Sequence, residues 1–230
     1  MVRRQNYVVL AIFATSMALL EAVVVVYMRR LYYPDTPLDL FPLEFLASYD
    51  PILELAREVS TIVMLVTVAF LAERKTLTRS FAAFVFVFGL WDILYYAWLK
   101  LLLGWPRDWT EWDVLFLVPT IWLGPWICPV LIALLFVVWG SSVLLSNKQH
   151  DLGKKGILLF VCGATAALAT FLQPAIPTRW EGGVDALTGY TPGSFWWWLF
   201  LPSYVAMSIG LWSCFSGSRN ANQIPASHEI

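Results

Sequence analysis

The sequence has few charged residues and no paired cysteines. Of its 230 residues, 13% are charged and 59% are hydrophobic, and the mean hydropathy is +0.68. Soluble domains have about 25% charged residues, so the composition indicates an integral membrane protein, with residues 1–215 forming one transmembrane helical domain. Cys128, Cys162 and Cys214 stand singly on apolar segments. A disulfide framework or a thiol redox site needs close pairs, and this pattern argues against both.

Several motifs that carry chemistry are also missing. The chain has no Gly-rich phosphate loop, nucleophile elbow, HExxH helix or haem-attachment CxxCH. The predicted spans contain no histidine, which argues against zinc, copper and haem sites. We therefore expect no haem, and no cofactor is evident. The net charge is −1, and the positions of the charged residues indicate how the chain crosses the membrane rather than a basic surface. We therefore also expect no nucleic-acid partner.

Six apolar runs are long enough to cross a bilayer as helices, which needs about 20 residues. The predicted fold class is all-α, a polytopic membrane helix bundle. The predicted spans are Tyr7–Met28, Ile52–Ala72, Ser80–Leu103, Pro125–Leu145, Gly156–Leu172 and Ser194–Phe215. Prolines at 119, 125 and 129 divide the fourth apolar region. We therefore expect Val114–Gly124 to be an interfacial or re-entrant half-helix before the fourth span.

Lysine and arginine are distributed unevenly over alternate connections. One side has nine of them, namely Arg3, Arg4, Arg74, Lys75, Arg79, Lys148, Lys154, Lys155 and Arg219. The other side has six, namely Arg29, Arg30, Arg57, Lys100, Arg107 and Arg179, and it also has many acidic residues. The positive-inside rule then predicts both termini in the cytoplasm, including a polar tail at 216–230. The expected location is a bacterial inner (plasma) membrane, with the long acidic connections facing the periplasm.

Three carboxylates fall inside or at the edge of predicted spans, at the same depth. Glu21 lies late in the first span, Glu58 early in the second, and Asp92 within the third. An ionisable group at such depth costs about 3 kcal/mol or more, so it faces a protein interior and has a partner or a task. Tyr96 and Lys100 follow Asp92 at intervals of four residues, on the same face of the predicted helix. We expect these two residues, Arg57 and the three carboxylates to form one pocket in the outer half of the bundle.

This pocket has three interpretations. The charges could pair and lock three helices together. Glu21, Glu58 and Asp92 could be ligands of a hard divalent cation, which prefers oxygen ligands. The same three could act as catalytic acids and bases or as a proton relay.

Two further features concern binding. Arg29 and Arg30 end the first span, where they would anchor it at the interface or grip a phosphate group of a lipid or substrate. Together with Arg57, Tyr96 and Lys100, Arg29 is a candidate binding residue for a substrate or partner. The outer connections are rich in tryptophan, from Trp105 to Trp198. Such an amphipathic aromatic surface suits a protein partner or lipids.

The sequence leaves three functions open. The first is an accessory component that docks into a larger membrane assembly through its Trp-rich outer loops, surrounded by membrane lipids. The second is a membrane enzyme acting on a lipid or isoprenoid substrate, with Glu21 and Asp92 as acid/base groups or metal ligands. The third is a transporter, which lacks support because no internal repeat is visible.

Overall fold

The computed structural model of the protein describes residues 2–41, 43, 50–118, 120–148, 150–176 and 190–216. The predicted polar tail, apart from Ser216, and most of the third outer connection lie outside these residues.

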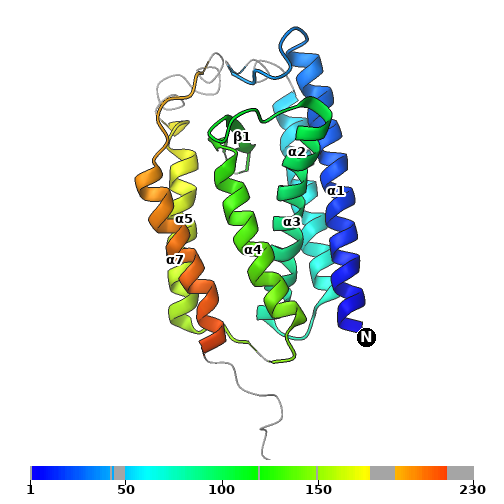
Figure 1. The fold of residues 1–230 in the computed structure, drawn as a ribbon, viewed down its shortest axis with the longest axis vertical. Helices are drawn as coiled ribbons and strands as arrows, with labels where there is room; N and C mark the ends of the chain where they lie inside the picture. The colour runs from blue at the N-terminus through cyan, green and yellow to red at the C-terminus, as the bar shows by residue number, and fades with distance from the viewer. Residues whose placement is uncertain are drawn as a thin grey trace, which may run out of the picture.

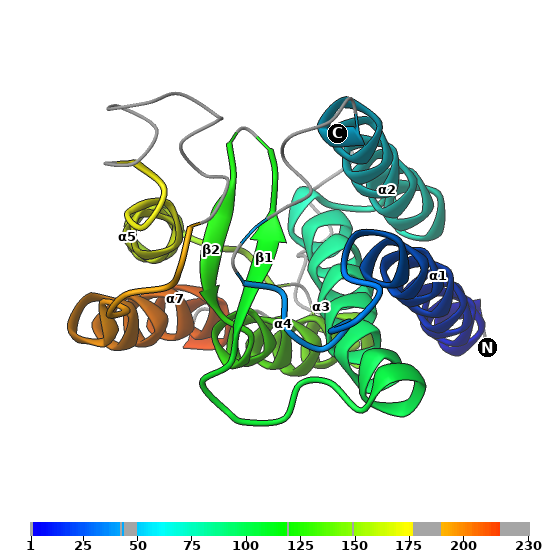
Figure 2. The ribbon, with the colours of Figure 1, turned by 90° about the horizontal axis from the view of Figure 1, so that it is seen from above.

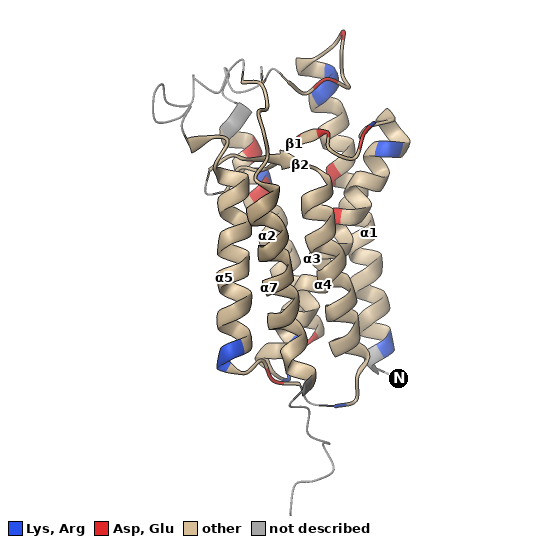
Figure 3. Ribbon diagram, turned by 60° about the vertical axis from the view of Figure 1, so that its left-hand side comes forward, with Lys and Arg blue, Asp and Glu red and all other residues tan. Residues whose placement is uncertain are grey.

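In the described ranges, six helices run up and down side by side (Figure 1). They are α1 (Val2–Tyr32), α2 (Asp50–Ala72), α3 (Leu77–Leu103), α4 (Ile127–Leu145), α5 (Lys154–Leu172) and α7 (Trp197–Ser216). All six are long and apolar enough to cross a membrane, as the sequence predicts. We call the end that holds the N-terminus the N-terminal end and the opposite end the hairpin end. Acidic residues gather toward the hairpin end (Figure 3).

The predicted half-helix at Val114–Gly124 is wrong. This segment belongs to an antiparallel hairpin of β1 (Trp112–Phe116) and β2 (Trp122–Pro125), with Val114 opposite Leu123. Two prolines, at 119 and 125, leave too few residues between them for a helix, while the aromatic and β-branched residues of β1 favour a strand. The two strands pair with each other, which satisfies the backbone groups on their facing edges without a helix.

The helices form two groups joined by the hairpin. In the first, α3 packs on α1, α2 and α4; in the second, α5 packs on α7. Glycines allow close approaches in both groups: a Cβ at Gly89 would lie 2.5 Å from the Ala133 carbonyl oxygen, and one at Gly163 2.7 Å from that of Ser203. Small residues at helix contacts are typical of membrane bundles. Seen from above, the hairpin crosses the space between α5 and α3 (Figure 2).

The N-terminal end is fixed by a buried arginine. The sequence places Arg79 in a cytoplasmic turn, yet its exposed fraction is only 7%. Its Nε and Nη2 atoms donate to the two oxygens of Glu73 at 3.0 and 2.9 Å, and it also donates to the carbonyls of Val143 and Leu144, each at 3.0 Å. These carbonyls end α4 and have no partner within that helix. Arg79 therefore joins the end of α2, the start of α3 and the end of α4.

Candidate functional site

A small cavity of about 100 Å³ lies at the hairpin end between α1, α2, α3 and β1. We call it the polar cavity because seven charged side chains are among the residues that line it. Its ionisable lining comprises Arg29, Arg57, Glu21, Glu54, Glu58, Asp92, Asp113, Tyr32, Tyr33, Tyr95 and Tyr96. The structure thus brings the predicted Glu21, Glu58, Asp92, Arg29, Arg57 and Tyr96 to one place. Their catalytic or binding role stays a prediction.

Arg57 links α2 to α1 across this cavity. Its guanidinium forms ion pairs with Glu21 of α1 and with Glu54 one turn earlier in α2. The Thr61 hydroxyl also donates to Glu21, at 3.4 Å. Glu21 is 5% exposed, and a buried carboxylate is tolerated when it is paired and hydrogen-bonded. Glu21 and Arg57 therefore fit the structural interpretation, since each already has a partner.

Glu58 connects α2 to the chain that follows β1. One of its carboxylate oxygens accepts a hydrogen bond of 2.7 Å from the backbone N–H of Leu117. Glu58 is 7% exposed. This bond holds the hairpin against α2, so the hairpin and α2 together form one side of the polar cavity.

Arg29 is not the interfacial anchor that the sequence predicts. It is 3% exposed, lies 3.3 Å from Asp113 of β1, and stacks 3.9 Å over the ring of Trp105. The Tyr96 hydroxyl donates to the other Asp113 oxygen at 3.0 Å. Burial raises the pKa of the Asp113 carboxyl, although the Arg29 charge and the Tyr96 hydrogen bond oppose the increase. The neighbouring Arg30 is exposed, as an anchor would be.

Asp92 lies where the polar cavity meets a second, larger one. This apolar cavity has a volume of about 640 Å³ and is enclosed by α2, α3, the hairpin, α4, α5 and α7. Four residues line both cavities: Trp91, Asp92, Leu115 and Phe116. Among the residues that the structure describes, none forms a hydrogen bond with the buried Oδ2 atom of Asp92. One buried oxygen of this carboxylate thus has no hydrogen-bond partner in the described part of the chain.

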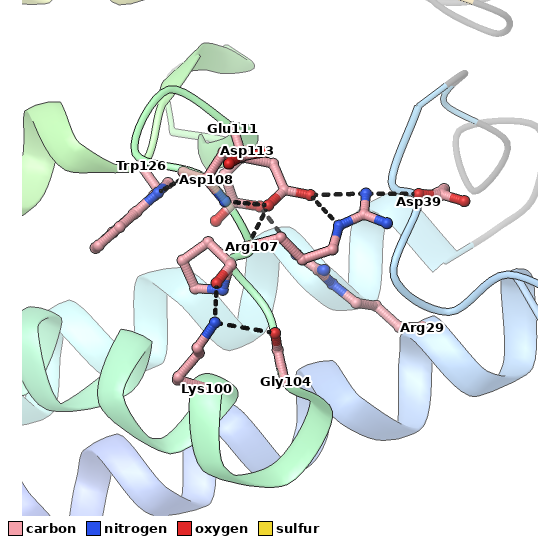
Figure 4. Close-up of polar contacts among 10 residues, drawn as sticks. Arg29, Asp39, Lys100, Gly104, Arg107, Asp108, Glu111, Asp113 and Trp126 are labelled. Atoms are coloured by element: carbon pink, nitrogen blue, oxygen red, sulfur yellow. Dashed lines mark hydrogen bonds and ion pairs between the residues drawn. The ribbon is translucent and has the colours of Figure 1, made fainter.

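Lys100 is not part of the site, contrary to prediction. It is exposed, and its Nζ atom donates to the carbonyls of Pro106 and Gly104 at 2.6 and 3.3 Å (Figure 4). Gly104 has a φ of 77° and turns the chain back over the end of α3. Four-residue steps advance by about 40° beyond a full turn. The stripe that starts at Asp92 has therefore left the cavity face when it reaches Lys100.

The predicted cation ligands do not form a metal site in the described ranges. Glu21, Glu58 and Asp92 line one cavity, yet the structure groups no three His, Cys, Asp or Glu residues there that could hold a metal ion. Glu21 is engaged by Arg57 and Glu58 by a backbone amide. A divalent-cation site at these positions finds no support in this geometry.

Sequence reasoning missed Glu54, Trp105 and Asp113 as members of the site. Asp113 belongs to an acidic outer connection in the sequence, yet only 3% of the residue is exposed. Trp105, expected on a docking surface, is fully buried beneath Arg29. The aromatic Trp112 and Phe116 and the β-branched Val114 are the signal that could have indicated a strand here. Trp109 remains on the surface, with an exposed fraction of 73%.

Comparison of the chain with models of protein families, with curated proteins and with solved structures finds no match.

Proposed function

We propose that the protein crosses a membrane and binds a lipid-like molecule inside its bundle. The apolar cavity would hold the hydrocarbon chain, and the polar cavity would hold the head at Asp92. The supporting observation is the shared wall of the two cavities, formed by Trp91, Asp92, Leu115 and Phe116. Ligand sites are mostly apolar, with a few polar groups that fix orientation, and occupy about 300–1,000 Å³. The apolar cavity of about 640 Å³ fits this description.

The chemistry available to a bound head is proton transfer. Asp92 has a buried oxygen without a hydrogen-bond partner in the described part of the chain, and Glu58 lines the same polar cavity. Either can act as a general acid or base on a head that lies between them. Glu21, which the sequence favoured for this role, is instead occupied by Arg57. An enzyme that acts on a lipid or isoprenoid substrate is the function class that these positions favour.

Docking as an accessory component of a larger assembly stays a prediction, as does transport. Among the described tryptophans, Trp109 is well placed for a partner, because 73% of it is exposed. Trp105 is buried, and the half-buried Trp126 donates to the Asp108 carbonyl at 2.8 Å.

Filling the apolar cavity should abolish lipid binding. We expect Ala164→Phe, on the cavity face of α5, to reduce lipid retention at least about tenfold, because the phenyl ring takes the volume of several methylene groups worth about 0.8 kcal/mol each. Native mass spectrometry of the purified protein measures the retained lipid. Ala169→Phe is the matched control, since it places the same ring on an exposed position of α5. Equal retention by both variants would refute the proposed site.

We further propose that the hairpin end faces away from the cytoplasm. Three of its cations are ion-paired with carboxylates: Arg29 with Asp113, Arg57 with Glu21 and Arg107 with Asp39. The N-terminal end has more lysine and arginine, which the positive-inside rule places in the cytoplasm. A bacterial inner membrane is the corresponding location.

This orientation predicts a labelling pattern in intact bacterial cells. In a Cys162→Ser background, Trp109→Cys should react with a membrane-impermeant maleimide, and Lys148→Cys should react only after the cells are lysed. Both positions are exposed, and the two other native cysteines are buried. The reverse pattern would overturn the orientation.

A further inference from the structure

The described residues that line the polar cavity include hydrogen-bond donors and one acceptor that have no hydrogen-bond partner. In the ranges that the structure describes, Arg29 Nε and Nη1, Trp91 Nε1 and Asp92 Oδ2 are buried and have no hydrogen-bond partner. All three residues line the polar cavity. A buried polar group without a partner destabilises the folded protein. A ligand that supplies acceptors to Arg29 or Trp91, and a donor to Asp92, would relieve this destabilisation.

The charge of the same wall disfavours an anionic ligand. Five carboxyl groups line the polar cavity against two guanidinium groups, those of Arg29 and Arg57. Arg57 pairs with Glu21 and Glu54, and Arg29 with Asp113. A phosphate or carboxylate head would therefore enter a site whose cations are already paired. Burying a charge without a counter-charge is costly.

These two observations restrict the head that the proposed function leaves open. We propose that the bound molecule is a neutral lipid whose head carries both a carbonyl oxygen and a free hydroxyl, the chemistry of a monoacylglycerol. The hydroxyl donates to Asp92 Oδ2, and the carbonyl accepts from Arg29 or Trp91. The acyl chain passes Leu115 and Phe116 into the apolar cavity. This inference rests on the proposed function, because it assumes that the two cavities hold one molecule.

The residues that line both cavities also indicate how the bound lipid is oriented. Trp91 and Asp92 are neighbours on α3, and both line the two cavities. The head groups they recognise must therefore lie within hydrogen-bond reach of the apolar cavity. In a monoacylglycerol the ester group and a hydroxyl are attached to adjacent glycerol carbons. Both groups therefore lie close to the first methylene groups of the acyl chain, which satisfies this requirement.

A panel of four oleoyl or oleyl lipids tests the inference on the unaltered protein. Monooleoylglycerol has the hydroxyl and the carbonyl, methyl oleate lacks the hydroxyl, oleyl alcohol lacks the carbonyl, and oleoyl lysophosphatidic acid adds a phosphate. In competition measured by native mass spectrometry, we expect monooleoylglycerol to be retained about tenfold better than methyl oleate or oleyl alcohol. Each of those lacks one hydrogen bond of about 1.4 kcal/mol. Lysophosphatidic acid should bind more weakly still.

Asp92→Leu separates recognition from folding. This variant should lose the preference for monooleoylglycerol over methyl oleate, because the hydroxyl then has no acceptor at residue 92. A change that merely damaged the fold would lower the retention of both lipids and leave their ratio unchanged. If Asp92→Leu does not fold, the four-lipid ranking on the unaltered protein decides the question alone.

Two failures have distinct signatures. Retention of lysophosphatidic acid equal to or above that of monooleoylglycerol overturns the neutral head but leaves lipid binding in place. Retention of monooleoylglycerol that Ala164→Phe does not reduce overturns the proposed function itself, and with it this inference.

Discussion

Replacing Arg79 with methionine should lower the free energy of unfolding by about 3–5 kcal/mol. The change removes the cation that pairs with Glu73 in a site where both residues are at most 7% exposed. It leaves a buried carboxylate without a counter-charge, and breaking a buried pair in this way costs about 3–5 kcal/mol. It also removes the donors to the Val143 and Leu144 carbonyls at the end of α4. SDS titration followed by circular dichroism measures the loss.

Two comparisons make this prediction specific. Arg74→Met is the matched control, since Arg74 lies in the same connection but is exposed, and such a change costs within about 0.5 kcal/mol. Adding Glu73→Gln to Arg79→Met should recover part of the loss, because it removes the unpaired charge. If Arg74→Met and Arg79→Met destabilise the protein equally, Arg79 does not hold the three helix ends together.

Most of the fold could be predicted from the sequence because hydropathy alone determines which segments can cross a bilayer. The six predicted runs correspond to six helices, although α1 extends from Val2 to Tyr32, beyond Tyr7–Met28, because polar residues continue the helix at both ends and hydropathy marks only its apolar part. The hairpin could not be recognised in the same way. Its strands are short, and their pairing depends on contacts between residues that hydropathy does not describe.

The polar cavity was predictable in part for a similar reason. Membrane depth placed Glu21, Glu58 and Asp92 at one level, and the structure brings them to one wall. Depth does not determine the direction of a side chain, so Lys100 was wrongly included. Asp113 was missed because its burial depends on the strand that positions it opposite Gly124.

Replacing Arg29 with methionine should be costly at neutral pH and much less so in acid. At pH 7 the change leaves Asp113 buried without its cation, and we expect a loss of about 3–5 kcal/mol in the free energy of unfolding. Arg30→Met, which alters an exposed neighbour, is the control and should cost within about 0.5 kcal/mol. SDS titration at pH 7 measures both.

The pH dependence follows from Asp113. Burial raises the pKa of this carboxyl in the folded protein, and Arg29 opposes the increase. A carboxyl whose pKa is raised by folding binds its proton more tightly in the folded state. Its contribution to stability is therefore complete below its ordinary pKa of about 3.9 and is lost as the pH rises through the folded value. Without Arg29 the folded pKa rises further, so the deficit of Arg29→Met should grow with pH across this window.

Adding Asp113→Asn to Arg29→Met should restore most of the stability at pH 7. The asparagine has no charge to bury, and its carbonyl oxygen can still accept the hydrogen bond that the Tyr96 hydroxyl donates to Asp113 at 3.0 Å. The double variant should also lose the pH dependence that Asp113 causes, which melting temperatures from intrinsic tryptophan fluorescence at pH 4 to 8 can measure. A deficit of Arg29→Met that is the same at every pH, and that Asp113→Asn does not relieve, would show that Arg29 stabilises the hairpin end through its stacking on Trp105 alone.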